Sequence, residues 1–261
     1  MLLANRTVAQ QLSGTNKDVV YRVHDVPDPD KVEALSKFVH KFGYSMRLPK
    51  KDQKNENGTR GATKAIKQLL ADSEGTVEQE LIHTLAIRTM PKAVYSTHNI
   101  GHYGLAFPYY THFTSPIRRY PDMMVHRLLT KYQGGARSAN KEKYEEYCEH
   151  CSDMEQVSQN AERDSIKYKM VEFMADKIGN TYDAHISGLT SYGIYAQIDE
   201  THCEGMIPIR DLGDDYYDFD EKNFVIVGRR HHTKYQLGDP IRIQVARANL
   251  ERKQLDFILA E

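Results

Sequence analysis

The sequence has little cysteine, and its cysteines are poorly placed for a disulfide or metal framework. Only three occur in 261 residues, Cys148, Cys151 and Cys203. The first two have CxxC spacing, which on paper could be half of a zinc site or a redox pair. They fall in a strongly helical acidic segment with no second pair of ligands nearby, so we interpret them as part of a buried helical face. No metal site is predicted within this chain.

The sequence also lacks a long apolar run and an excess of charge of either sign. No apolar stretch approaches membrane-spanning length, and the first residues do not resemble a signal peptide. We therefore expect a cytoplasmic protein with no membrane partner. The 35 basic residues nearly balance the 36 acidic ones, so the chain as a whole is not a polycation. Its length is sufficient for two domains and a substantial core.

Hydrophobic periodicity in the first 178 residues predicts mostly helix with some strand. Helices are expected at residues 30–42, 63–70, 77–90 and 140–177, and a strand at residues 19–26. Residues 50–61 are polar and predict a solvated loop. In the last and longest helix, apolar residues recur at three- and four-residue steps and form one continuous stripe. Gly179 marks the end of that helix and a domain boundary.

From residue 182 onward, the pattern changes to short alternating strands separated by turn signals. Five strands are expected, at residues 182–189, 192–198, 205–209, 240–249 and 254–259. Five short strands in this length fit an OB-type barrel, whose face and loops bind oligonucleotides. Residues 179–261 carry nine basic and fourteen acidic side chains. The barrel alone should therefore bind RNA weakly, through stacking and a local basic face.

The most distinctive stretch is residues 110–129, which reads YTHFTSPIRRYPDMMVHRLL. Pro116 can begin a helix, with Ser115 as its N-cap. Arg118 and Arg119 would then lie in the first turn, where cations oppose the helix dipole, which suggests that they bind an anion such as phosphate. A capped surface helix whose arginines pair with local acids fits equally well. The apolar residues expected to pack inward are Ile117, Tyr120, Met123, Met124 and Leu128.

This stretch closely resembles the signature of the RNase II/RNase R family of processive 3′→5′ exoribonucleases. The preceding NIGHYGLAFPYY and the earlier YRVH also resemble that family. The resemblance implies hydrolysis of single-stranded RNA to nucleoside 5′-monophosphates. It also implies that Arg118, the arginine of SPIR, contacts the scissile phosphate and stabilises the charge of the transition state. Ser115 and Arg119 are expected to position the RNA 3′ end.

Two further resemblances supply candidate RNA-binding residues. Residues 161–164, AERD, resemble an acidic element of the family, which makes Glu162 a candidate active-site neighbour, although a charge pair along the helix explains it nearly as well. The words GLTSYGIYAQI and EGMIPIRDL resemble an S-one-type RNA-binding domain. Tyr192 and Tyr195 occupy the positions where that domain stacks aromatic rings on bases. Pro208 replaces its usual histidine and leaves Arg210 as the nearest basic residue.

The resemblance implies an α+β chain in two parts. Residues 1–178 correspond to the C-terminal half of the catalytic domain, and residues 179–261 to a five-stranded OB-fold barrel. The family holds Mg²⁺ with an aspartate-rich motif, expected upstream of residue 1 together with cold-shock domains. No equivalent cluster occurs in the sequence, so Mg²⁺ ligands are not expected within this chain.

Two functional interpretations therefore remain. The first is an exoribonuclease fragment that is inactive alone, and the second is a non-catalytic RNA-binding or adaptor protein of the same family. An aspartate-rich motif in the upstream reading frame would favour the first, and a genuine start at Met1 the second.

Overall fold

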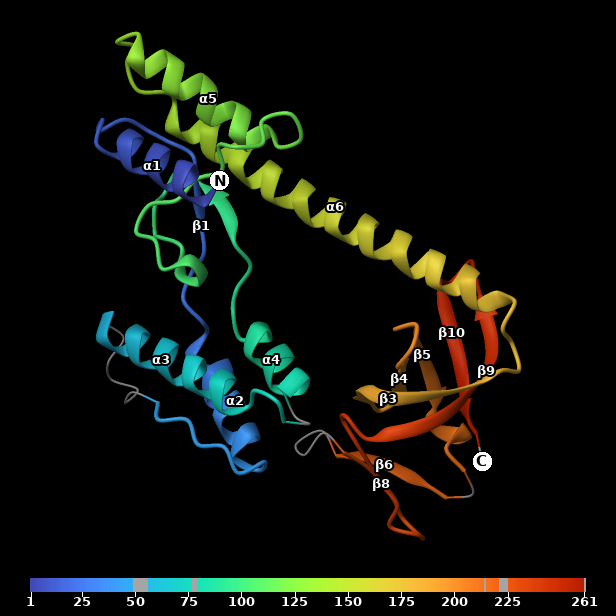
Figure 1. Ribbon diagram of the computed structural model, residues 1–261. Helices are drawn as coiled ribbons and strands as arrows, with labels where there is room; N and C mark the ends of the chain where they lie inside the picture. Colours follow the sequence, from blue (N-terminus) through green and yellow to red (C-terminus); the bar gives the residue numbers. More distant parts are fainter. Residues whose placement is uncertain (49–55, 77–78, 214, 221–224, 261) are drawn as a thin grey trace. The chain divides into compact units, whose positions relative to one another are not determined.

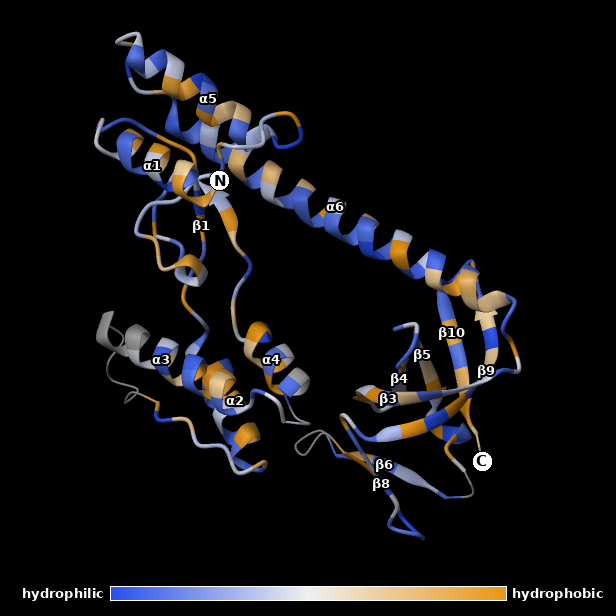
Figure 2. Ribbon diagram, in the orientation of Figure 1, coloured by the Kyte–Doolittle hydropathy of each residue, from blue (hydrophilic) through white to orange (hydrophobic). Residues whose placement is uncertain are grey.

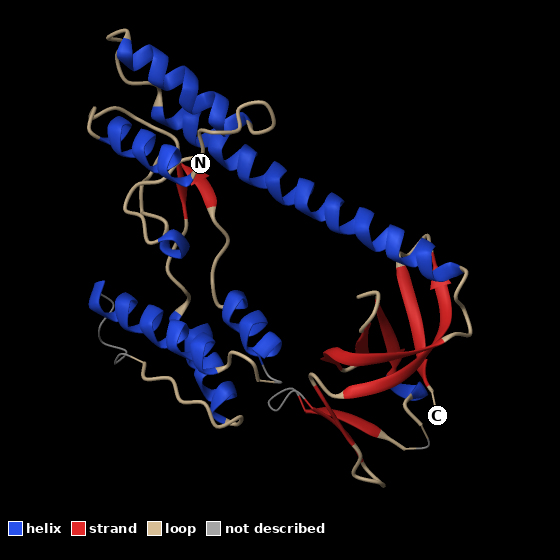
Figure 3. Cartoon of the chain, viewed as in Figure 1, coloured by secondary structure: helices blue, strands red, loops and turns tan. Residues whose placement is uncertain are grey.

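The computed structural model describes residues 1–48, 56–76, 79–213, 215–220 and 225–260 (Figure 1). It is an α+β structure, as predicted, with helices and strands distributed as in Figure 3. By its internal contacts the chain divides into two compact units. The first comprises Met1–Asp72 and Thr84–Gln159, and the second Ser73–His83 and Asn160–Glu261. Among the described residues, no helix is both long and apolar enough to cross a membrane.

The core of the first unit joins segments that are far apart in the sequence. Helix α1 (Leu2–Ser13) and helix α5 (Tyr120–Gln133) pack with a two-stranded antiparallel sheet, β1 (Tyr21–Val23) and β2 (Val94–Ser96). The start of helix α6 (Lys141–Ala175) contributes to the same core. The buried apolar side chains include Leu12, Val20, Tyr95, Val125, Leu128 and Cys148. This packing places the segment between β2 and α5, which contains the predicted phosphate-binding residues, over a rigid base.

The remaining helices largely follow the predicted pattern. Helix α2 (Pro29–His40) begins after Asp28, whose carboxylate accepts a hydrogen bond from the Asp30 N–H at 2.9 Å. Helix α3 (Glu56–Asp72) begins inside the predicted 50–61 loop, so that prediction is wrong for residues 56–61. Residues 50–55 lie outside the described residues. Helix α4 (Gln79–Arg88) falls within the predicted helix at residues 77–90.

Helix α6 is the predicted long helix, but its apolar stripe is not buried along its whole length. Cys148 is buried in the first unit, and Val171 and Met174 are buried against the barrel of the second. Met154 and Val157 between them are exposed, and Figure 2 shows a mainly hydrophilic middle of the helix. The expectation of a continuous buried stripe is therefore wrong, because each end of α6 packs in a different core.

The second unit contains the predicted barrel. Its five strands close in the order β10-β5-β4-β3-β9, which confirms the OB-type architecture. The strands are β3 (Thr181–Thr190), β4 (Gly193–Ile198), β5 (Glu204–Pro208), β9 (Pro240–Asn249) and β10 (Gln254–Leu259). A parallel pairing of Asp256 with Met206 closes the barrel. Its interior is filled by large apolar side chains, among them Ile186, Ile194, Ile207, Ile243 and Phe257.

A second sheet, which the sequence analysis missed, packs on this barrel. It consists of β6 (Tyr217–Asp220), β7 (Val225–Gly228) and β8 (Lys234–Gln236), all antiparallel. No strand was predicted between residues 209 and 240, which is wrong for β6, β7 and β8. The acids of β6 alternate with aromatic residues, and Tyr217 and Phe219 pack against the barrel core while the intervening acids lie on the opposite face.

The barrel core should tolerate no side chain at Gly205. A Cβ atom there would lie 2.6 Å from the ring of Phe257, which is fully buried and cannot move aside. Gly205→Ala should therefore lower the free energy of unfolding by about 1–3 kcal/mol, measured by urea denaturation. Gly14→Ala is the matched control, because the nearest atom to its added Cβ is 3.6 Å away. Equal unfolding midpoints for both variants would contradict this account of the core.

Candidate nucleic-acid interface

The SPIRR segment forms a turn that precedes helix α5. The N–H groups of Arg118 and Arg119 both donate to the carbonyl oxygen of Ser115, at 3.3 and 3.0 Å. Helix α5 begins at Tyr120, with Arg119 in extended backbone geometry as its N-cap and Pro121 in its first turn. The prediction of a helix beginning at Pro116 with Ser115 as N-cap is therefore wrong. Pro121, rather than Pro116, is the proline that the first helical turn accommodates.

The side chains around this turn divide into buried and exposed groups. Met124 and Leu128 are buried as predicted, because they lie within α5. Ile117 is fully exposed and Tyr120 is about half exposed, so their predicted inward packing is wrong. Ile117 precedes the helix, and its direction does not follow the helical period. The turn thus projects its tip, Ile117 and Arg118, away from the core.

Asp122 anchors the turn to the helix. Its fully buried carboxylate oxygen Oδ2 accepts hydrogen bonds from the Ser115 N–H at 2.7 Å and the Arg119 guanidinium at 2.9 Å. The Arg119 side chain is only 20% exposed. Arg118 is exposed, and within the described part of the chain no carboxylate forms an ion pair with it. Each of the two interpretations offered for these arginines therefore applies to one of them. Arg119 pairs with a local acid, and Arg118 remains available for an anion.

The residues before the turn are fixed by hydrogen bonds from several elements. The Asn5 side chain of α1 donates to the Tyr110 hydroxyl at 3.0 Å and accepts from the Phe113 N–H at 3.1 Å. The Thr111 hydroxyl donates to the carbonyl of Val20 at 2.7 Å. The Phe113 ring stacks on His126 of α5 with centroids 3.9 Å apart. The sequence analysis did not identify Asn5, whose role depends entirely on tertiary contacts.

The histidines of this region serve as structural hydrogen-bonding groups. The Tyr95 hydroxyl lies 2.9 Å from His112 Nδ1, and burial together with the charges of Arg119 and Arg22 lowers the pKa of His112 to about 4. Burial and the neighbouring His24 likewise lower the pKa of His102 to about 4. Both rings are therefore neutral at pH 7. In the described residues, no group of three or more His, Cys, Asp or Glu side chains is arranged to hold a metal ion.

The barrel exposes both of the tyrosines predicted to stack on bases. Tyr192, in the turn before β4, is 78% exposed, and Tyr195 on β4 is 36% exposed. Tyr195 lies beside Gly188 of β3, where a Cβ atom would come 3.4 Å from the Cβ of Tyr195. Arg210 is exposed in the short helix η2 (Ile209–Asp211), with its guanidinium 3.7 Å from the carboxylate of Asp211.

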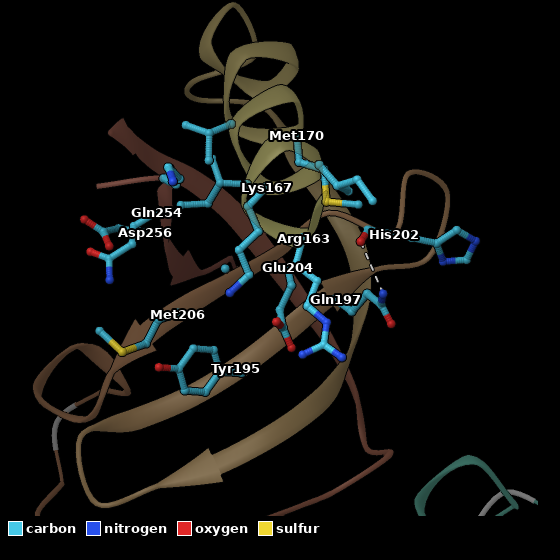
Figure 4. Close-up of a pocket in the computed structure, with 15 residues that line it drawn as sticks. Arg163, Lys167, Met170, Tyr195, Gln197, His202, Glu204, Met206, Gln254 and Asp256 are labelled. Carbon is cyan, nitrogen blue, oxygen red and sulfur yellow. Dashed lines mark hydrogen bonds between the residues drawn. The ribbon is translucent and has the colours of Figure 1, made fainter. Parts of the chain in front are cut away.

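A hollow of about 400 Å³ lies between the C-terminal part of α6 and strands β4, β5 and β10. Tyr195 and Met206 line its barrel side, whereas Tyr192 and Arg210 lie outside it. Figure 4 shows Arg163 and Lys167 of α6 pointing toward the strand face that carries Tyr195. The hollow therefore combines an aromatic ring, apolar surface and cations with two carboxylates, those of Glu204 and Asp256.

Both cations of α6 in the hollow were absent from the residues predicted to bind RNA. Arg163 and Lys167 are four residues apart and so share a helix face, but the sequence does not show which face meets the barrel. Lys253 of the barrel forms an ion pair with Asp164 at 2.5 Å, which fixes that face against β10. Glu162 is exposed on the same helix and does not line the hollow. Glu162 belongs to the second unit, and Ser115, Arg118 and Arg119 to the first.

Comparison with known proteins supports this arrangement. The RNB domain model matches residues 1–135, and the S1 RNA binding domain model matches residues 175–259. Ribonuclease R of Aquifex aeolicus is 37% identical over 265 residues, covering 100% of this chain and 36% of the relative. Ribonuclease R of Thermotoga maritima is 34% identical, with the same coverage of both chains. This chain therefore spans just over a third of the length of these curated relatives.

A solved structure extends the likeness to three dimensions. It is RNase R of Mycoplasma genitalium in complex with ribose-methylated single-stranded RNA, with a TM-score of 0.87 and 29% sequence identity. The match covers 100% of this chain and 40% of that one. The family match spans more than half of the chain and includes the turn that carries Arg118. The chain belongs to the RNB family, and its barrel is an S1 RNA-binding domain.

Proposed function

We propose that this chain is part of a cytoplasmic 3′→5′ exoribonuclease that hydrolyses single-stranded RNA to nucleoside 5′-monophosphates. The observation that carries the proposal is the exposed guanidinium of Arg118, which forms no ion pair with any described carboxylate, beside an arginine that is paired with Asp122. Membership of the RNB family and the likeness to ribonuclease R support the reaction class. The S1 domain supports RNA as the substrate.

In this proposal, Arg118 is the catalytic residue of the chain. Its planar guanidinium can donate two parallel hydrogen bonds to a phosphate, and it stabilises the negative charge that builds up during attack on the scissile bond. Arg119 is a positioning residue, because it holds the turn through Asp122. Ser115 contributes to the same turn and, with Arg119, places the RNA 3′ end at Arg118. Glu162 is proposed as an active-site neighbour in the intact enzyme.

The carboxylates near this turn do not fit a Mg²⁺ site. Asp122 is buried and already binds Ser115 and Arg119. Glu145 accepts hydrogen bonds from the hydroxyls of Ser96 and Thr97. Hydrolysis with two metal ions needs several carboxylates that are free to bind them. We propose that the Mg²⁺-binding aspartates lie elsewhere in the intact protein, as do cold-shock domains, and we derive no step through a metal from this chain.

The hollow of the second unit is proposed to hold one nucleotide of the RNA. A base would pack on Tyr195 and Met206, and the adjoining phosphate would lie near Arg163 and Lys167. Tyr192 offers a second exposed ring for a neighbouring base. Arg210, just after β5, is proposed as a further RNA contact, in which a phosphate would replace the Asp211 carboxylate that lies 3.7 Å from its guanidinium. Stacking of this kind tolerates any base sequence, as a processive nuclease requires.

The chain alone should not hydrolyse RNA. Purified residues 1–261, incubated with Mg²⁺ and a 3′-end-accessible single-stranded RNA, should bind the RNA and release no mononucleotides, because the metal-binding carboxylates are not supplied. Product analysis by gel or chromatography tests this directly. Processive release of nucleoside 5′-monophosphates by this chain would contradict the proposed division of the active site.

Substitution of the two adjacent arginines should have different effects on the intact enzyme. Arg118→Ala should slow single-turnover cleavage about 10²–10³-fold without loss of folding stability. Arg118→Lys should also slow cleavage, because an ammonium cannot donate the two parallel hydrogen bonds of a planar guanidinium. Arg119→Ala should lower the free energy of unfolding by about 3–5 kcal/mol, because it leaves Asp122 buried and unpaired.

Arg127→Ala is the matched control for both arginines, since Arg127 is an exposed arginine of α5 outside the turn. It should change neither turnover nor stability. If Arg118→Ala weakened RNA binding in proportion to the rate, or if Arg119→Ala left stability unchanged, the assigned roles would be wrong.

Variants of the proposed RNA-binding residues should show which side chains bind RNA by stacking and which by charge. Tyr195→Ala and Tyr192→Ala should each weaken binding of single-stranded RNA by about 1–3 kcal/mol with little change in salt dependence. Joint replacement of Arg163 and Lys167 by alanine should reduce the salt slope by about 0.7 for each phosphate that is no longer neutralised. Lys169→Ala, on the same helix but outside the hollow and paired with Glu172, is the control. Wild-type affinity in both tyrosine variants would rule out the stacking platform.

A further inference from the structure

Positively charged residues cluster in the turn between β7 and β8. Residues 229–234 read RRHHTK, and all six are exposed. Most other cations of this unit's barrel lie within 4.0 Å of a carboxylate. These paired cations are Arg210, Arg242, Arg247 and Lys253. Arg230 and Lys234 form no ion pair with any described residue, so their charge remains open to a ligand.

Several hydrogen bonds hold the backbone of this turn. The Gly228 N–H donates to the Thr233 carbonyl and the Arg229 N–H to the Tyr216 carbonyl, both at 2.8 Å. Asp215 accepts hydrogen bonds from the N–H groups of Tyr216 at 2.7 Å, Arg230 at 2.9 Å and His231 at 2.9 Å. Gly228 allows this approach, because a Cβ atom there would collide with the Asp215 carboxylate. The side chains of the turn are therefore presented from a fixed backbone, which lowers the entropy lost when they bind a ligand.

An aromatic ring lies next to Arg230. Tyr216 is 65% exposed, and the Arg230 guanidinium lies over its ring at 5.2 Å from the centroid. Arg229, by contrast, is occupied by two hydrogen bonds to the Asp218 carboxylate, at 2.6 and 2.7 Å. The surface that remains open is thus a tyrosine ring, a guanidinium and the Lys234 ammonium. None of these three residues lines the hollow beside Tyr195.

We propose that Tyr216, Arg230 and Lys234 form a second RNA contact on the S1 domain, separate from the hollow. Arg230 and Lys234 bind successive phosphates of a single strand, and a base stacks on Tyr216 and the guanidinium that covers it. The aromatic ring favours a nucleic acid over an acidic protein segment, because only the nucleic acid supplies a planar partner beside each anion. The inference rests on the proposed function and adds a second point at which the strand is held.

The test compares two double variants of the full chain that remove the same charge. Arg230→Ala with Lys234→Ala should weaken binding of single-stranded RNA and reduce its salt slope by about 1.4, which is 0.7 for each of two phosphates. Arg242→Ala with Arg247→Ala, at acid-paired positions of β9, should leave the slope near the wild-type value. Tyr216→Ala should weaken binding about five-fold or more and leave the slope unchanged.

Three outcomes overturn the proposal. The first is an equal effect of the two double variants, and the second is wild-type affinity in Tyr216→Ala. The third is a turn variant that loses binding to poly-L-glutamate but keeps its RNA affinity, which would assign the turn to an acidic protein partner. Tyr195→Ala measured in parallel separates this proposal from the proposed function. If Tyr195→Ala weakens binding and the turn variants do not, only the second RNA-binding surface is wrong.

Discussion

The buried carboxylate of Asp122 is the interaction on which the candidate catalytic turn depends. A buried carboxylate is costly unless it is paired and hydrogen-bonded. Oδ2 of Asp122 accepts from the Ser115 N–H and the Arg119 guanidinium, whereas its buried Oδ1 has no hydrogen-bond partner among the described residues. These two bonds fix both ends of the SPIRR turn to the first turn of α5. They also occupy one of two adjacent arginines. Arg118 therefore lies at the exposed tip of a hydrogen-bonded turn, with no ion pair to a carboxylate in the part of the chain that the structure describes.

Whether a cation is paired with a carboxylate also distinguishes the proposed RNA-binding surfaces of the second unit. The S1 region has more acidic than basic residues, and most of its described cations lie next to a carboxylate. Two pairs of cations without an ion pair to any described carboxylate are proposed to bind phosphates. Arg163 and Lys167 are contributed by α6, and Arg230 with Lys234 by the added sheet. A barrel with an unfavourable net charge can thus bind an anionic strand at defined points.

The features that were predicted correctly are those that depend on local residue patterns. The barrel strands followed from alternation and turn signals, and the length of α6 followed from its helical period. The start of α5 could not be predicted, because two prolines, Pro116 and Pro121, suit a first helical turn and a tertiary contact of Asp122 decides between them. The added sheet was not predicted, because acidic residues alternate with the aromatic residues of β6. The alternating aromatics Tyr217 and Phe219 were the signal that could have identified it.

The central claim, that Arg119 is held while Arg118 is free, can be measured without any mutation. Nitrogen-detected NMR of arginine side chains in the full chain reports rotation of each guanidinium and its response to a titrated ligand. The account predicts slow rotation for Arg119 at neutral pH, fast rotation for Arg118, and shifts confined mainly to Arg118 within this turn on addition of a short single-stranded RNA. Slow rotation of Arg118 in the free chain, or an RNA response at Arg119 with none at Arg118, would contradict it.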